Sequence, residues 1–302
     1  MLNGRVYALP LDPSVQIFLY RTDLFHDAKL CRAYYERFHE NLVVPTTYEQ
    51  YLHAAEFFTR SCNPDSPTEY GTTMTCGSAS VAASDFLPFY LSRIDRFGST
   101  PETLRLDCPE MQAAMRQYHA LEKFSCKQNW WGDSIQKFAE GKTAMTVIYS
   151  NYAAELINSG NSVVVGRVGA AILPGCKPLL GGGIVGISRY SQKAEACKQF
   201  FHWYYSADLA SLLVRLGGTS PIVDAYEDFQ NYSIFPWMNT SKKSFGLGQR
   251  GVINQTPERF SIPKYEFAVG TAVRNVVQDL MTPEDASRMA QALFDAADPV
   301  CR

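Results

Sequence analysis

The sequence predicts an α/β fold, in which strands alternate with helices along the chain. Short apolar segments bounded by turn residues alternate with longer segments whose apolar residues recur at helical spacing. The chain has 302 residues, of which 46% are hydrophobic and 19% are charged. It is therefore long enough to bury the core of one large or two medium domains.

In the first half of the chain, residues 6–10 and 16–20 are predicted strands. Asp23 is the expected N-cap of a helical turn, and a helix is predicted to begin near Pro45 behind a threonine cap. A strand is predicted after Tyr70. The remaining elements of this half are helices predicted over residues 82–94, with Pro88 marking a kink or the start, and from Pro109 onward.

In the second half, a short helix from Asp133 is expected to end at Gly141, and a strand follows over residues 143–149. Another helix is predicted to reach residue 157. The remaining predictions are one or two strands over 163–173, a glycine turn and strand over 181–188, and helices over 194–205, 208–216, 263–281 and 283–297.

Composition excludes several classes of function. The net charge of -2 gives no basic surplus for nucleic acid, and no run of about 18 apolar residues predicts a membrane span. The start has no signal-peptide pattern, so we expect either that an N-terminal part is missing or that the protein stays in the cytoplasm. Five histidines show no helical pairing, and no nucleophile elbow, phosphate loop or dinucleotide motif is present. We predict no enzyme, no metal and no cofactor.

The eight cysteines form no C-x-x-C pair. Most are expected to be free thiols, which favours a reducing compartment. Disulfides such as Cys62 to Cys76 or Cys108 to Cys126 remain open alternatives, because sequence alone does not fix a pairing.

Four segments carry a resemblance to a known family. Residues 138–145 read Phe-Ala-Glu-Gly-Lys-Thr-Ala-Met, and residues 181–188 read Gly-Gly-Gly-Ile-Val-Gly-Ile-Ser. Residues 19–25 read Leu-Tyr-Arg-Thr-Asp-Leu-Phe, and residues 45–51 read Pro-Thr-Thr-Tyr-Glu-Gln-Tyr. In this order the chain resembles the extracellular solute-binding proteins of bacterial ABC importers, the family that includes maltose-binding protein.

The resemblance implies a periplasmic-binding-protein-like type II fold, with two lobes joined by a hinge. Family members carry more residues at the N-terminus, so the first lobe is expected to be incomplete. The implied division assigns residues 11–160 mainly to the second lobe. Residues 1–10 and approximately 160–302 would form the remainder of the first lobe, the hinge and the C-terminal helices.

The same resemblance implies a function without catalysis. The chain would bind a small polar solute between its lobes, first of all a carbohydrate (a sugar or an oligosaccharide), for delivery to the permease subunits of an ABC importer. It would be a monomeric extracellular or periplasmic lipoprotein, anchored through a missing N-terminus. The alternative is a cytoplasmic ligand-sensing module of a transcriptional regulator with the same fold, which the cysteines and the absent signal peptide favour.

The candidate ligand-binding residues combine aromatic rings, which suit the apolar faces of sugars, with polar groups that suit hydroxyls. Tyr149, Asn151 and Tyr152 are the best supported, because they follow a strand where free backbone amides point outward. The other candidates are Asp12, Trp130, Trp131, Gly182, Gly183, Ile184, Trp237 and Arg250.

Most of these candidates also have a purely structural interpretation. Asp12 suits a turn after Pro10, and one of the paired tryptophans suits packing under a loop. The glycines suit a simple tight turn. Trp237 suits the core of a lobe, and Arg250 suits a solvated loop.

Overall fold

The computed structural model describes residues 5–94, 105–158, 160, 162–227, 230, 235–249 and 261–296. Its strands are β1 Leu9–Pro10, β2 Ser14–Arg21, β3 Thr72–Thr75, β4 Ser125–Gln128, β5 Met145–Tyr149, β6 Val168–Ala171, β7 Leu180–Gly181 and β8 Ile184–Val185. Its longer helices are α2 Ala28–Phe38, α3 Tyr48–Phe57, α4 Ala79–Leu91, α5 Pro109–Glu122, α6 Trp131–Ala139, α8 Ala194–Tyr204, α9 Ala207–Arg215, α11 Pro236–Leu247, α12 Ile262–Val277 and α13 Pro283–Asp295. The short ones are α1 Thr22–Phe25, α7 Glu155–Asn158, η2 Ser150–Tyr152, η3 Pro174–Cys176 and η4 Val223–Tyr226.

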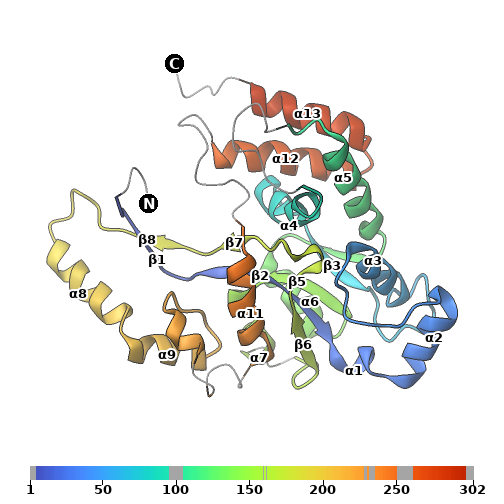
Figure 1. The fold of residues 1–302 in the computed structure, drawn as a ribbon, viewed down its shortest axis with the longest axis horizontal. Coiled ribbons are helices and arrows are strands. Elements are labelled where there is room, and N and C mark those ends of the chain that lie inside the picture. The colour runs from blue at the N-terminus through green and yellow to red at the C-terminus, as the bar shows by residue number, and fades with distance from the viewer. Residues whose placement is uncertain are drawn as a thin grey trace.

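Strand β2 is the centre of the sheet (Figure 1). It pairs antiparallel with β5 on one side, with Gln16 opposite Tyr149, and with β6 and β7 on the other. Strands β3 and β4 are parallel, and Met145 donates its backbone N–H to the Gly71 carbonyl beside them. The predicted α/β architecture is therefore present, with the predicted strand 16–20 at its middle.

Two hydrophobic clusters cover the two faces of β2. Phe18 points into a cluster built from α3, α4, α5, α12 and α13, whereas Ile17 and Leu19 point into another built from α6, α9 and α11. Successive side chains of a strand point to opposite faces, so a strand buried on both faces reads as a continuous apolar run. The C-terminal helices α12 and α13 thus share one core with α4 and α5, while the predicted division into lobes stays a prediction.

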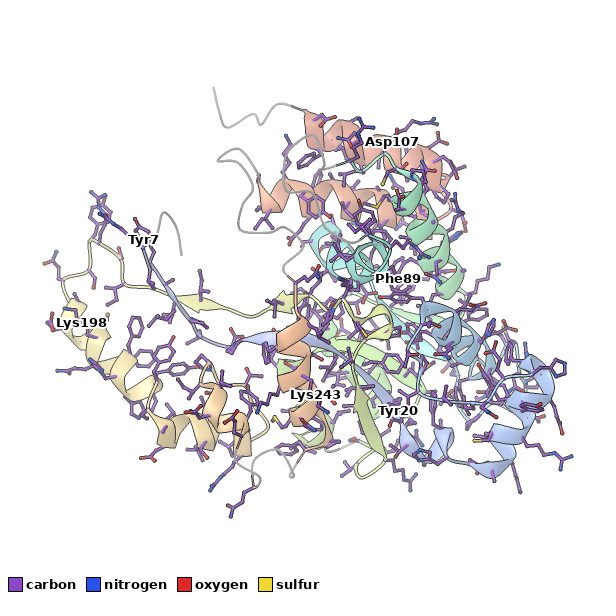
Figure 2. All side chains as sticks on the ribbon, in the orientation of Figure 1. Tyr7, Tyr20, Phe89, Asp107, Lys198 and Lys243 are labelled. Carbon is purple, nitrogen blue, oxygen red and sulfur yellow. The ribbon has the colours of Figure 1, made fainter. Side chains whose placement is uncertain are left out.

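Strands β1 and β8 and helix α8 form an arm that extends from this body (Figure 1). Helix α8 buries none of its residues, and Trp203 is 58% exposed. Figure 2 shows Tyr7 and Lys198 on the arm, far from the densely surrounded Phe89 of the body. The end of α8 is joined to β1 and the residue after it, because the Tyr204 and Tyr205 hydroxyls donate to the backbone carbonyls of Leu11 and Pro10.

Several element boundaries differ from the predicted ones for local reasons. Asp23 does not cap a helix, because its carboxylate accepts two hydrogen bonds from Arg21, and Asp27 caps α2 instead. The strand predicted after the glycine turn is only the two-residue β8, and β7 ends at Gly181 ahead of the turn, where Gly182 has a φ of 100°. Gly141, with a φ of 73°, ends the turn after α6 as predicted.

Helix α4 runs through Pro88, where a kink or a helix start was predicted. Proline lacks an N–H, so the carbonyl of Ser84, four residues earlier, loses its helical partner. The side chain of Gln16 replaces that partner, because its Nε2 donates to the Ser84 carbonyl at 2.8 Å. The same side chain accepts from the Leu179 N–H through Oε1 at 2.9 Å. Gln16 is fully buried, so both ends of its amide are used in the core.

This arrangement predicts a coupling between Gln16 and Pro88. Gln16→Leu keeps the side chain's size but leaves the Ser84 carbonyl and the Leu179 N–H unpaired, so it should lower the free energy of unfolding by roughly 2–4 kcal/mol. Pro88→Ala supplies an N–H to the Ser84 carbonyl. Its effect on the free energy of unfolding should therefore be more stabilising by about 1–2 kcal/mol in the Gln16→Leu background than in the parent. Urea denaturation of the four proteins measures this, and additive effects would contradict the coupling.

Asp85 is a second buried polar residue of α4. Its Oδ2 accepts from the Tyr118 hydroxyl at 2.7 Å and from the Thr75 backbone N–H at 3.2 Å. Burial raises the pKa of Asp85 to about 7, although the hydrogen bonds from Tyr118 and Thr75 act in the opposite direction. The folded protein therefore keeps this carboxyl protonated at pH values where the unfolded chain, with a pKa of about 3.9, has lost the proton.

Asp85 should make the protein less stable as the pH rises. Below about pH 4, Asp85 is protonated in both the folded and the unfolded state, so it does not make stability depend on pH. Between about pH 4 and 7, the folded state binds more protons than the unfolded state, so the free energy of unfolding falls as the pH rises. Asp85→Asn removes this dependence. In denaturant titrations, the free energy of unfolding of Asp85→Asn relative to that of the parent should increase by about 1.4 kcal/mol per pH unit between pH 5 and 6.5. Parallel pH profiles for Asp85→Asn and the exposed-site control Asp65→Asn would contradict this.

Candidate ligand-binding site

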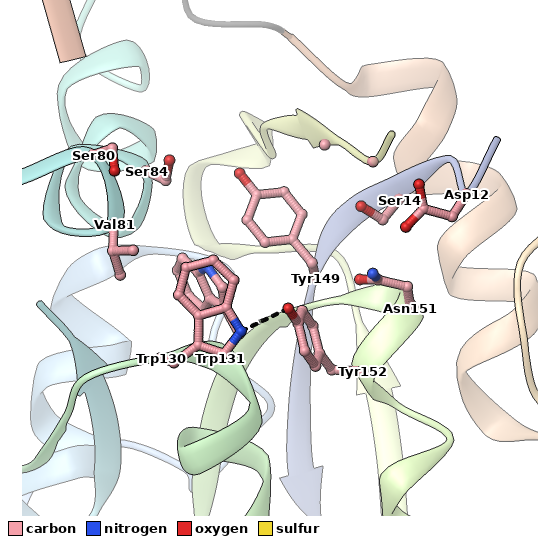
Figure 3. Close-up of a pocket in the computed structure, with 12 residues that line it drawn as sticks. Asp12, Ser14, Ser80, Val81, Ser84, Trp130, Trp131, Tyr149, Asn151 and Tyr152 are labelled. Carbon is pink, nitrogen blue, oxygen red and sulfur yellow. Dashed lines mark hydrogen bonds between the residues drawn. The ribbon is translucent and has the colours of Figure 1, made fainter. Parts of the chain in front are cut away.

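A cavity of about 340 Å³ lies at the end of the sheet where β2 begins and β5 ends (Figure 3). The segments that meet there are the start of α4, the start of α6, the η2 turn and the glycines after β7. The lining residues are Asp12, Ser14, Ser80, Val81, Ser84, Trp130, Trp131, Tyr149, Asn151, Tyr152, Gly181 and Gly182.

Four aromatic rings form one wall of the cavity. Trp131 is 3% exposed and contacts the Tyr149 ring edge-on at 5.2 Å, so this pair is fixed by packing. Trp130 is 49% exposed, and its Nε1 donates to the Tyr152 hydroxyl at 2.8 Å (Figure 3). The Tyr152 oxygen thus receives one hydrogen bond and keeps its own proton to donate. The wall offers both apolar ring faces and a hydroxyl donor.

Asp12 forms the opposite rim with the glycine turn. Its Oδ1 accepts from the Gly183 backbone N–H, which fixes the turn against the segment that enters β2. A Cβ on Gly182 would lie 2.2 Å from the Asp12 carbonyl oxygen, and the φ of 100° also requires glycine there. Among the described residues, the second carboxylate oxygen of Asp12 accepts no hydrogen bond, so it can accept one from a bound molecule.

The charge of Asp12 acts on the tyrosines around it. The pKa of Tyr152 is raised chiefly by burial and also by the Asp12 carboxylate, against the lowering effect of the hydrogen bond from Trp130. Burial and Asp12 likewise raise the pKa of Tyr204. Both phenols therefore stay neutral donors at physiological pH. Among the described lining residues Asp12 is the one carboxylate, and no lysine, arginine or histidine accompanies it.

Asn151 supplies an amide at the floor of the cavity. Its Oδ1 is buried and has no hydrogen-bond partner within the described part of the chain. The neighbouring Ser150 hydroxyl accepts from the Val15 backbone N–H at 3.3 Å and so joins η2 to β2. A buried polar atom without a partner carries a free-energy cost that a ligand hydroxyl removes.

The structure brings seven of the predicted residues to this cavity: Asp12, Trp130, Trp131, Tyr149, Asn151, Tyr152 and Gly182. Gly183 adjoins it through its bond to Asp12. That these residues contact a ligand stays a prediction. Arg250 lies outside the described residues.

Two predicted residues do not line this cavity. Trp237 is 3% exposed, stacks on Phe235 at 4.9 Å and belongs to the cluster beneath β2, so it lies in the core and does not line the cavity. Ile184 is 74% exposed on β8 of the arm and does not line the cavity either. The core interpretation of Trp237 is the one that the structure supports.

Sequence reasoning missed Ser14, Ser80, Val81 and Ser84. Three of them lie in the first turns of α4, whose N-cap is Ser78. A Ser-x-Ser pattern ahead of an apolar run signals a helix start, and it could have moved the predicted helix back to residue 79. Ser14 carries no local signal, because it joins the cavity only through the pairing of β2 with β7.

Other features bear on the alternatives. The described part of the chain holds no group of three His, Cys, Asp or Glu side chains that could bind a metal ion. None of its helices has both the length and the apolar character needed to cross a membrane. The seven described cysteines are free thiols, so the Cys62–Cys76 and Cys108–Cys126 pairs are not formed.

Solved structures with this fold come from several bacteria. A solute-binding protein of Agrobacterium radiobacter K84, in complex with ribitol, has a TM-score of 0.77 and 23% identity over 97% of this chain and 72% of its own. The maltose-bound T. maritima MalE3 has a TM-score of 0.76 and 21% identity, with 97% and 73% covered. A Thermotoga lettingae protein bound with α-D-tagatose has a TM-score of 0.74 and 18% identity, with 97% and 74% covered.

These similarities show a periplasmic solute-binding protein fold, as the sequence predicted, and the chain spans 72% to 74% of the length of these proteins. The family itself is shown by a sequence model described as "Bacterial extracellular solute-binding protein", which matches residues 1–237. Such proteins bind solutes outside the cytoplasm and catalyse no reaction. The chain belongs to the bacterial extracellular solute-binding proteins.

Proposed function

We propose that the protein binds a hydroxyl-rich solute, a sugar or a polyol, in the cavity between Tyr152 and Asp12. The observation that carries the proposal is the combination of exposed ring face, unpartnered amide oxygen and free carboxylate oxygen around one cavity. Sugars present apolar C–H faces and a rim of hydroxyls, so they match both kinds of group.

The similar proteins support the chemical class. Those with bound ribitol, maltose and α-D-tagatose all hold uncharged polyhydroxyl compounds. The lining of this cavity has one carboxylate and no cation among its described residues, which suits a ligand without an anionic group.

The protein would act in transport. It would close around the solute by movement of the arm about the segments between β1 and β2 and between β7 and β8, and deliver the solute to the permease subunits of an ABC importer. Asp12 and Gly182 lie at these crossings, so ligand contacts there would favour the closed state. We further propose that the protein is a monomer and is anchored to the membrane surface.

A second candidate rests on the free thiols. The seven cysteines of the described residues are unpaired, which suits a reducing compartment, where the same fold would sense a solute for a cytoplasmic regulator. Fractionation of cells that express the complete gene product distinguishes the two: recovery outside the cytoplasmic fraction supports transport, and recovery within it supports sensing.

The direct test is a thermal-shift screen of the protein against neutral monosaccharides, oligosaccharides and alditols, followed by calorimetric titration of each hit. At least one neutral compound should raise the melting temperature in proportion to its concentration, because binding to the folded state alone stabilises it. Stabilisation by amino acids or phosphates in place of any sugar or alditol would contradict the proposal.

Removing one ring tests the site itself. Tyr152→Ala, and separately Tyr149→Ala, should weaken the binding of the best neutral compound by about 1–3 kcal/mol, since each loses a desolvated ring contact. Tyr35→Ala, on the exposed surface of α2, is the matched control and should leave affinity unchanged. Circular dichroism checks that each variant is folded. Unaltered affinity in both cavity variants would remove these rings from the site.

A further inference from the structure

The end of α8, on the arm, carries two adjacent tyrosines whose hydroxyls reach the segment ahead of β2 (Figure 1). The Tyr204 hydroxyl donates to the Leu11 carbonyl, and the Tyr205 hydroxyl donates to the Pro10 carbonyl. Pro10 ends β1, and Leu11 comes directly before Asp12, the carboxylate of the candidate site. The two hydroxyls therefore bind the backbone beside a cavity-lining residue, although neither tyrosine lines the cavity itself.

Leu11 continues this connection into the glycine turn. Its N–H donates to the Gly183 carbonyl at 2.8 Å, and the Gly183 N–H donates to Oδ1 of Asp12. Leu11 is thus bonded through its carbonyl to α8 and through its N–H to the residue that holds Asp12. Three consecutive hydrogen bonds join the Tyr204 hydroxyl to the Asp12 carboxylate, so a shift of α8 relative to β1 would move that carboxylate.

The rings of the two tyrosines are held by other aromatic rings. Tyr204 stacks on Phe200 with 5.8 Å between centroids, and it meets the ring of Tyr205 edge-on at 5.2 Å. Burial and the nearby Asp12 carboxylate raise the pKa of Tyr204, and burial also raises the pKa of Tyr205. Both phenols therefore keep the proton that they donate, and their positions are set before a ligand binds.

The Asp12 side chain has little else to fix it. In the part of the chain that the structure describes, its carboxylate accepts the Gly183 N–H and forms no ion pair. The direction of its other oxygen therefore depends on the backbone of residues 10–12. Two hydrogen bonds from one helix end to the consecutive carbonyls of Pro10 and Leu11 fix the orientation of this backbone, whereas a single bond would leave it free to rotate.

We propose that Tyr204 and Tyr205 are positioning residues for the binding site, whose hydroxyls hold residues 10–12 so that the free oxygen of Asp12 faces a bound solute. This role rests on the proposed function and adds to it two residues outside the cavity that control its affinity. Because neither tyrosine lines the cavity, their effect on affinity must pass through Asp12. That dependence separates positioning from a general structural role.

Calorimetric titration with maltose, ribitol and D-tagatose measures this dependence. Replacing both tyrosines, Tyr204→Phe with Tyr205→Phe, should lower the affinity for a compound that the parent binds by about five-fold or more. In the Asp12→Ala background the same pair should change the affinity less than two-fold, since the carboxylate that it positions is gone. An equal loss in both backgrounds, or no loss in the parent background, would overturn the proposal.

The matched control is Tyr190→Phe on the same arm. Tyr190 is 74% exposed, and its hydroxyl makes no hydrogen bond to another described residue. This substitution removes the same atom from a tyrosine of the arm and should leave affinity unchanged in both backgrounds. Circular dichroism checks that every variant is folded.

A measurement without ligand separates this proposal from the proposed function. Hydrogen exchange with mass spectrometry reports on the Leu11 and Gly183 amides in peptides over residues 9–14 and 181–188. Both peptides should exchange at least three-fold faster in the double phenylalanine variant than in the parent or in Tyr190→Phe. Unchanged exchange would overturn the proposal whether or not a ligand binds. Faster exchange, with no sugar or polyol bound by the parent, would defeat the proposed function and the tyrosines' role in binding, but not their hold on residues 10–12.

Discussion

The side chain of Gln16 determines the shape of the site. It extends from β2 to the Ser84 carbonyl of α4 in one direction and to the Leu179 N–H ahead of β7 in the other. The first segment lines the candidate site through Ser84, and the second leads into Gly181 and Gly182, which line it as well. Because the amide is fully buried, neither bond can be exchanged for water, and each wall is fixed relative to the sheet. Pro88 makes this possible, since it frees the Ser84 carbonyl from the helix.

The aromatic wall depends on the same strand. Tyr149 lies opposite Gln16 in the pairing of β2 with β5, and the η2 turn then places Asn151 and Tyr152 one turn further on. Trp131 begins α6, whose Phe138 is buried in the cluster beneath β2. The elements that carry the rings therefore pack into one core, which restricts the rings before a ligand binds. Little conformational entropy is then lost on binding.

Much of the fold could be predicted from local patterns. Gly141 and the apolar run that follows it were enough to predict the turn and strand leading to Tyr149. Asn151 and Tyr152 follow that strand and line the cavity, while their contact with a ligand stays a prediction. What failed needed tertiary information. Trp237 has the composition of a sugar-stacking residue, but only the packing of α11 against β2 shows that it is covered. Likewise, no sequence pattern relates Gln16 to Ser84, 68 residues away.

The two sides of the cavity differ in how extensively they are packed, and this difference bears on closure. The wall formed by α4, β5 and α6 packs into the two hydrophobic clusters on the faces of β2. Asp12 and Gly183, in contrast, lead into the arm, whose helix α8 buries none of its residues. A ligand hydroxyl bound to both Asn151 and Asp12 would therefore link a rigid wall to a movable one. Only contacts that differ between open and closed states can drive such a movement. The Asp12 rim, and not the aromatic wall, is the place where binding free energy would be converted into closure.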